Sequence, residues 1–181
     1  MALRDLPWVP IYLNLMPVGC ILQGSGPVQQ IWHARPLKGS ADWEGCKNRG
    51  LPRRRGKGSC DLFETTWNPS KGEWGGGRIL GAPTSAGWES QPSVSADGQT
   101  LVFAQSSRGR DKPSDLVMCR RMASGGWSQP EPLLGLVNTP YTEESPFLHP
   151  DGQTLYFSSD GHPGFGQLDV FVSRLQADGT W

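Results

Sequence analysis

The chain has 181 residues, with 17 Lys and Arg against 17 Asp and Glu, so its formal net charge is zero. A balanced charge lacks the basic surface of a general nucleic-acid binder, and we expect no nucleic-acid partner. No apolar run reaches the roughly 18 residues that a membrane-spanning helix needs, and the abundant Gly, Pro and Trp predict an all-β, turn-rich fold.

Residues 1–46 show no sustained hydrophobic period, which predicts an irregular N-terminal leader. An export segment is the alternative, because Arg4 precedes a mostly apolar stretch that ends at Gly19-Cys20, where lipidation of the cysteine could follow cleavage. Asp5 and three prolines interrupt that stretch, so it fits such a segment poorly. The cysteines form no CxxC pair, which argues against a zinc site, and we expect no metal or other cofactor.

The rest of the chain contains an internal repeat. Segments 89–127 and 143–181 share 13 identities in 39 positions without a gap, at an offset of 54 residues. The same offset extends back to Asp61, and the matches fade before about residue 47. Residues at repeated positions are Asp61, Asp115 and Asp169, then Asp97-Gly98 and Asp151-Gly152, then Trp127 and Trp181.

Each repeat unit predicts four short strands. In the second unit these are residues 90–95, 100–105, 115–121 and 127–134, with an Asp97-Gly98 turn between the first two. Four strands recurring at a period near 50 residues are typical of a β-propeller. The sequence thus predicts about two and a half four-stranded antiparallel blades within 47–181. They are a partial blade over 47–88, a full blade over 89–142, and a blade without its outer strand over 143–181.

The third unit carries the motif Ser145-Pro146-Phe147, Asp151-Gly152, Thr154 to Ser159, Asp169 and Phe171-Val172-Ser173. This motif resembles the WD-like "Pro-Asp" repeat, which is related to the TolB propeller, and the resemblance covers about residues 47–181. Such repeats occur in bacterial cell-envelope proteins, often of the OmpA family. The resemblance therefore implies a periplasmic or outer-membrane-associated protein. The second unit departs from the motif at Leu101 to Gln105 and at Arg110 to Pro113.

The most conspicuous residues recur from unit to unit, whereas a catalytic residue is usually unique. We therefore expect Asp97 and Asp151 to form hairpin turns rather than a sialidase-type Asp-box or a metal site. The strand-initial aspartates should hydrogen-bond backbone, and the tryptophans should fill the space between blades and offer an indole donor. No nucleophile motif is present around the histidines, which predicts that the chain is not an enzyme.

The loops between second and third strands are the expected binding surface, because propeller loops vary freely on a fixed frame. Candidate residues there are Arg53, Arg54, Arg55, Arg108, Arg110, His162 and Phe165. The sequence thus favours a non-catalytic binding or scaffold module for envelope protein or glycan. The alternative is the propeller portion of a prolyl-oligopeptidase-like hydrolase. Exposed blade edges further predict self-association.

Overall fold

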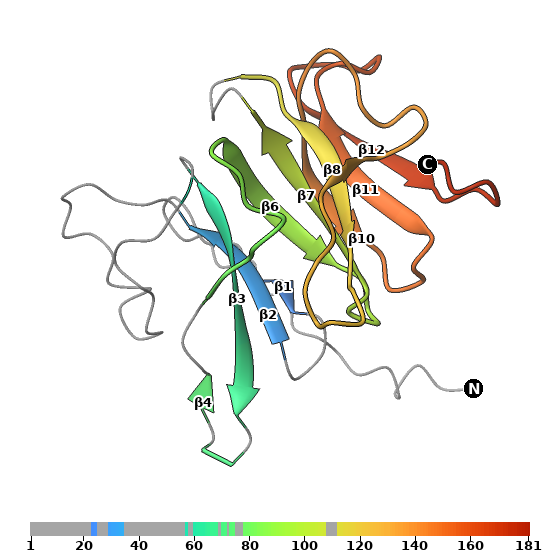
Figure 1. Ribbon diagram of the computed structural model, residues 1–181. Coiled ribbons are helices and arrows are strands. Elements are labelled where there is room, and N and C mark those ends of the chain that lie inside the picture. The colour runs from blue at the N-terminus through green and yellow to red at the C-terminus, as the bar shows by residue number, and fades with distance from the viewer. Residues whose placement is uncertain are drawn as a thin grey trace.

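The computed structural model describes residues 23–24, 29–34, 57, 60–68, 70–71, 73–74, 78–107 and 112–181 (Figure 1). This part of the chain holds strands in three antiparallel sheets and contains no helix. Accordingly, the described residues include no helix of the length and apolarity needed to span a membrane. The three sheets lie side by side in chain order (Figure 1).

The first sheet consists of β1 (Gln23–Gly24), β2 (Gln29–Ala34), β3 (Asp61–Asn68), β4 (Glu73–Trp74) and β5 (Arg78–Ile79). Its order is β1-β2-β3-β4, and β5 also pairs with β3. Strands β1 and β2 fall within 1–46, where the sequence predicted irregular chain, so this sheet begins well before residue 47. The repeat did not reveal these two strands because the long connection from β2 to β3 breaks the 54-residue spacing between equivalent positions.

The second and third sheets consist of the strands predicted for the two matching units. The second sheet has the order β6 (Trp88–Val94), β7 (Thr100–Ser106), β8 (Asp115–Arg120) and β9 (Glu131–Pro132). The third has the order β10 (Glu143–Leu148), β11 (Thr154–Ser159) and β12 (Asp169–Arg174). The fourth strand of the second sheet is only two residues long, shorter than the range 127–134 that the pattern gave.

Two backbone features recur in both sheets. Gly98 and Gly152 adopt φ angles of 71° and 69° in the hairpin turns, a region that glycine enters without steric cost. Gln91 and Ser145 each have a φ of 54° inside the first strand of their sheet, where the register with the second strand shifts by a β-bulge. The hydrophobic pattern predicted the turns but not the bulges, because side chains at a bulge leave the alternating pattern of the strand.

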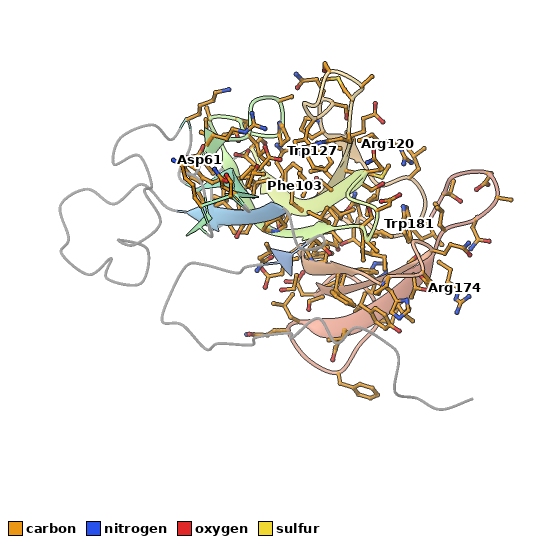
Figure 2. All side chains as sticks on the ribbon, turned by 90° about the horizontal axis from the view of Figure 1, so that it is seen from below. Asp61, Phe103, Arg120, Trp127, Arg174 and Trp181 are labelled. Atoms are coloured by element: carbon orange, nitrogen blue, oxygen red, sulfur yellow. The ribbon has the colours of Figure 1, made fainter. Side chains whose placement is uncertain are left out.

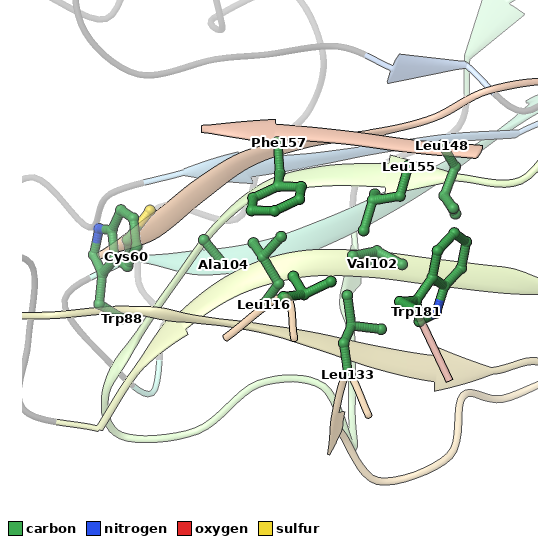
Figure 3. Packing of buried hydrophobic residues seen from close by; sticks show 11 residues of the cluster. Cys60, Trp88, Val102, Ala104, Leu116, Leu133, Leu148, Leu155, Phe157 and Trp181 are labelled. Atoms are coloured by element: carbon green, nitrogen blue, oxygen red, sulfur yellow. The ribbon is translucent and has the colours of Figure 1, made fainter. Parts of the chain in front are cut away.

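Two apolar clusters join the sheets, and strand β7 contributes to both. Leu101 and Phe103 pack in the cluster that includes Leu62 of β3 and Leu80, which directly follows β5. Val102 and Ala104 point to the opposite face, into the cluster that contains Leu148, Leu155 and Phe157 of the third sheet (Figure 3). Successive strand residues point to opposite faces, so an uninterrupted apolar run at 101–104 allows the second sheet to be buried on both sides.

Equivalent hydrogen bonds join each sheet to the next. The Glu89 N–H donates to the Cys60 carbonyl at 3.1 Å, and the Glu143 N–H donates to the Ser114 carbonyl at 2.8 Å. Both bonds connect the residue before a third strand to the first strand of the following sheet. The sheets therefore succeed one another in the same relative arrangement, and the ends of the β2–β3 and β7–β8 connections lie against the following sheet.

Candidate functional site

The aspartates of the hairpin turns are occupied by their own turn. Asp151 Oδ1 accepts from the N–H groups of Gln153 and Thr154, both at 2.8 Å, and Oδ2 accepts from the Thr154 hydroxyl. The Gln153 hydrogen bond contributes most to lowering the pKa of Asp151 to about 2. Asp97 has a lowered pKa for the same kind of reason, with hydrogen bonds from the Ser95 hydroxyl and the Gln99 N–H. Such bonds stabilise the turn and leave these carboxylates poorly placed to bind a ligand.

The strand-initial aspartates hold the loop that precedes them. Asp61 Oδ1 accepts from the Lys57 N–H at 3.0 Å, and Asp169 Oδ2 accepts from the N–H groups of Phe165 at 2.6 Å and Gly166 at 3.1 Å. In each case the first donor lies four residues before the aspartate. Asp115 occupies the equivalent position, and partial burial followed by the nearby charge of Glu143 raises its pKa. Asp61 and Asp169 thus shape the loops that precede them.

The two repeated tryptophans fill the space between sheets. Trp127 belongs to the cluster between the first and second sheets, and Trp181 to the cluster between the second and third (Figure 2). Arg121 lies over the Trp127 ring, with its guanidinium carbon 4.8 Å from the ring centroid. Neither indole N–H has a hydrogen-bond partner among the described residues. Packing therefore explains both positions better than the expected indole bond does, and the cation–π contact adds to it at Trp127.

Two buried glutamates form a feature that the sequence reasoning did not assign. Glu143 is fully buried and accepts from the Thr139 N–H at 2.9 Å, the Thr139 hydroxyl at 2.6 Å and the Ser159 hydroxyl at 2.8 Å. Glu89 is its equivalent, with hydrogen bonds from Ser85 and Gln105. Glu89 and Glu143 are the first identical pair of the two matching segments, and this identity is the sequence signal that could have revealed a structural role for them. Both carboxylates connect a preceding turn to the second strand of their sheet.

A third buried glutamate joins two sheets. Glu64 of β3 accepts from Arg78 of β5 at 2.6 Å and from Arg121, beyond the end of β8, at 2.9 Å. Its side chain is 2% exposed, and that of Arg121 is 19% exposed. This buried ion pair spans 57 residues of sequence and contributes to the contact between the first and second sheets.

The β11–β12 loop, residues 160–168, presents an apolar side chain on a well-held backbone. The Phe165 side chain is fully exposed, and Leu168, three residues later, is also exposed. The two hydrogen bonds to Asp169 hold the loop. A Cβ on Gly164 would lie 2.0 Å from Asp169 Oδ2, so the loop has no room for a larger residue there. An exposed aromatic residue on an ordered loop is typical of an interface anchor.

His162, the other candidate of this loop, faces the protein interior. Its Nε2 lies 2.9 Å from the Val137 carbonyl oxygen, and its ring packs against Phe157 and Phe171 at centroid distances of 5.7 and 5.0 Å. His162 therefore supports the loop and does not extend the exposed surface. The basic candidates Arg53, Arg54, Arg55, Arg108 and Arg110 lie outside the described residues.

No protein-family model matches this chain, and a search of curated proteins found no match.

A small pocket lies between the second and third sheets. Its volume is about 60 Å³, and it is lined by Ser95, Thr100, Met118, Arg120, Leu148, Gly152, Leu175 and Trp181. Small-molecule sites usually occupy roughly 300–1,000 Å³. This pocket is too small for such a ligand, so the exposed β11–β12 loop is the better candidate for a binding site.

Proposed function

We propose that the three sheets are successive blades of a β-propeller of the type that the "Pro-Asp" and TolB-like resemblance implies. Three observations support this architecture. The strands follow one another across the second and third sheets in chain order. The second sheet is covered by apolar side chains on both faces. Equivalent backbone hydrogen bonds join each sheet to the next.

We infer that this propeller is a non-catalytic binding module. The supporting observation is that the recurring polar residues have structural tasks: Asp97 and Asp151 form turns, Asp169 holds a loop, and Glu143 joins a turn to a strand. Each of these side chains accepts hydrogen bonds from backbone N–H groups or hydroxyls that lie within 16 residues of it in the chain. A repeated frame of this kind positions loops, and propeller loops are common binding surfaces.

The β11–β12 loop is the proposed contact site, with Phe165 as its anchor. The single observation that carries this proposal is the fully exposed Phe165 side chain on a loop held by Asp169 and His162. Because the loop is preorganised, binding would lose little conformational entropy. Leu168 of the same loop is also exposed and apolar. An apolar pocket on a protein suits this site better than a glycan does. From the resemblance we propose that this partner is a protein of the bacterial cell envelope.

Site-specific photo-crosslinking tests this proposal. Phe165 is replaced by the photoreactive amino acid benzoylphenylalanine, the chain is expressed in a bacterial host, and crosslinked products are identified by mass spectrometry. Tyr141 is the matched control, because it is an aromatic residue with 59% exposure outside the loop. A protein that crosslinks from position 165 and not from 141 is then purified, and its affinity is measured with the wild-type and Phe165→Ala chains.

We expect Phe165→Ala to weaken that affinity at least about tenfold, as loss of an aromatic anchor usually does. Equal crosslinking from positions 165 and 141 would contradict the proposed site. Unchanged affinity of the Phe165→Ala chain would also contradict it. A crosslinked glycan in place of a protein would retain the site but change the partner class.

A further inference from the structure

Two hydroxyl groups meet at one oxygen of the buried Glu143. Glu143 Oε1 accepts from the Thr139 hydroxyl at 2.6 Å and from the Ser159 hydroxyl at 2.8 Å. The Thr139 oxygen also accepts from the Tyr141 N–H at 3.1 Å. The Ser159 oxygen likewise accepts from the Gly161 N–H at 3.0 Å. A hydroxyl both donates and accepts, so one carboxylate oxygen ties the chain before β10 to the start of the β11–β12 loop.

Two further contacts join the same segments, which are the β9–β10 connection, residues 133–142, and the first residues of the loop. The Thr142 N–H donates to Asp160 Oδ1 at 2.8 Å, and the Asp160 N–H donates to the Thr142 carbonyl at 3.2 Å. His162 Nε2 lies 2.9 Å from the Val137 carbonyl oxygen, to which it can only donate. The first three loop residues are therefore all attached to the preceding connection, directly or through Glu143.

The two segments also pack too closely for a side chain at Gly161. A Cβ there would overlap the Thr139 hydroxyl oxygen and lie 2.8 Å from the Thr139 Cβ. The second sheet has the same arrangement with the roles exchanged, because there Gly87 of the connection has no room for a Cβ beside the Ser106 carbonyl oxygen. Glycine allows two backbones to approach closely. The contact between connection and loop is thus a feature of both sheets.

The hydroxyl link to the loop is particular to the third sheet. In the second sheet, Glu89 also accepts from a serine of the preceding connection, Ser85, whose oxygen accepts from the Gly87 N–H at 2.9 Å. The residue one repeat before Ser159 is Gln105, which donates its amide to Glu89 at 3.3 Å. An amide NH₂ donates but does not accept, so it cannot hold a loop N–H as the Ser159 hydroxyl does.

We propose that Ser159 is a positioning residue for the β11–β12 loop and thereby sets the affinity of the contact site at Phe165. The statement on affinity rests on the proposed function. Ser159 is 1% exposed, so it acts on a partner only through the loop. Ser159 fixes the start of the loop and Asp169 fixes its end, which holds the loop backbone in one arrangement before binding. Apparent affinity falls when only a fraction of the molecules has the binding-competent conformation.

Hydrogen exchange, measured residue by residue by NMR on the full chain, tests the positioning role without a partner. Ser159→Ala should accelerate exchange of the Phe165 and Gly166 N–H groups about three- to tenfold, as loss of one buried hydrogen bond would. These two groups donate to Asp169 and not to Ser159, so the effect would have to travel through the loop. Backbone amides of β11 and β12 should keep their wild-type rates. The matched control is Ser158→Ala, the same change at the half-buried neighbour, which should leave the loop rates unchanged.

Asp160→Ala is a second variant that serves if Ser159→Ala fails to fold, because Asp160 is exposed. It removes the acceptor of the Thr142 N–H and should accelerate the same two loop amides, whereas Asp160→Asn keeps an oxygen acceptor and should restore the wild-type rates. Unchanged loop rates in Ser159→Ala, or in Asp160→Ala if the first variant is unfolded, would overturn the proposal. An equal acceleration throughout β11 and β12 would also overturn it, because Ser159 would then stabilise the whole sheet and not the loop.

The effect on affinity is measured with the protein that crosslinks from position 165. Ser159→Ala should raise the Kd about three- to tenfold, and Ser158→Ala should leave it unchanged. An unchanged Kd in Ser159→Ala would overturn the link between this residue and binding. The two proposals fail in different measurements: Phe165→Ala tests the contact site by affinity, and exchange in Ser159→Ala tests the positioning role without any partner.

Discussion

Replacing the buried Glu143 should destabilise the fold by an amount that depends on how many of its hydrogen bonds survive. Its carboxylate accepts three hydrogen bonds, two of them from Thr139 and one from Ser159. In Glu143→Gln, the amide oxygen can still accept from the two hydroxyls. The amide NH₂ then faces the Thr139 N–H, which is also a donor, so that bond is lost. Glu143→Ala removes all three bonds and leaves a cavity.

The magnitudes follow from the cost of unsatisfied buried groups. One lost hydrogen bond with a buried donor left unpaired costs about 1–3 kcal/mol of unfolding free energy. We therefore expect about 1–3 kcal/mol for Glu143→Gln, and about 3–5 kcal/mol for Glu143→Ala, where the cavity adds to the lost bonds. The second value is a large part of the roughly 5–15 kcal/mol that stabilises a typical domain.

Urea unfolding followed by circular dichroism measures these differences at a concentration where the chain is monomeric. Glu131→Gln is the matched control, because Glu131 is exposed in β9 and undergoes the same chemical change. It should alter the unfolding free energy by less than about 0.5 kcal/mol. If Glu143→Gln were as stable as this control, the buried carboxylate would not be held by its hydrogen bonds and the reasoning would be refuted.

Three further predictions concern other described residues. Glu64→Gln should cost about 2–4 kcal/mol in chemical unfolding, because it removes a buried carboxylate charge that accepts from both Arg78 and Arg121; an effect near zero would contradict this. The lowered pKa of Asp151 means that its ionised form stabilises the folded state above the unfolded pKa near 4 and that this contribution is lost as the pH falls towards about 2. Carboxyl NMR titration should find the low value, and a midpoint near 4 in the folded chain would exclude it. Gly135→Ala should destabilise more than Gly98→Ala in thermal melting, because both glycines have positive φ but only at Gly135 would a Cβ lie 2.1 Å from a backbone carbonyl oxygen; equal melting temperatures would argue against that contact.

The sequence alone determined the second and third sheets. Asp-Gly turns and alternating apolar strands are local features, and each is set by residues within a few positions of one another. The repeat then placed Asp97 and Asp151, or Asp115 and Asp169, at equivalent positions. That equivalence predicted structural roles for the aspartates. Asp97, Asp151 and Asp169 do accept hydrogen bonds from backbone N–H groups of their own turns or loops.

Only the tertiary structure decided how distant segments meet. Strand β2 joins β3 across a connection whose length the fixed repeat could not accommodate. Glu64 meets Arg121 from 57 residues away, and His162 turns inward because Phe157 and Phe171 provide a surface for its ring. Burial and pairing of this kind depend on which sheet faces which, and a pattern along one chain does not encode that directly. The exposure of Val170 and Val172 follows in the same way, since their equivalents in the second sheet are buried only because the third sheet packs on them.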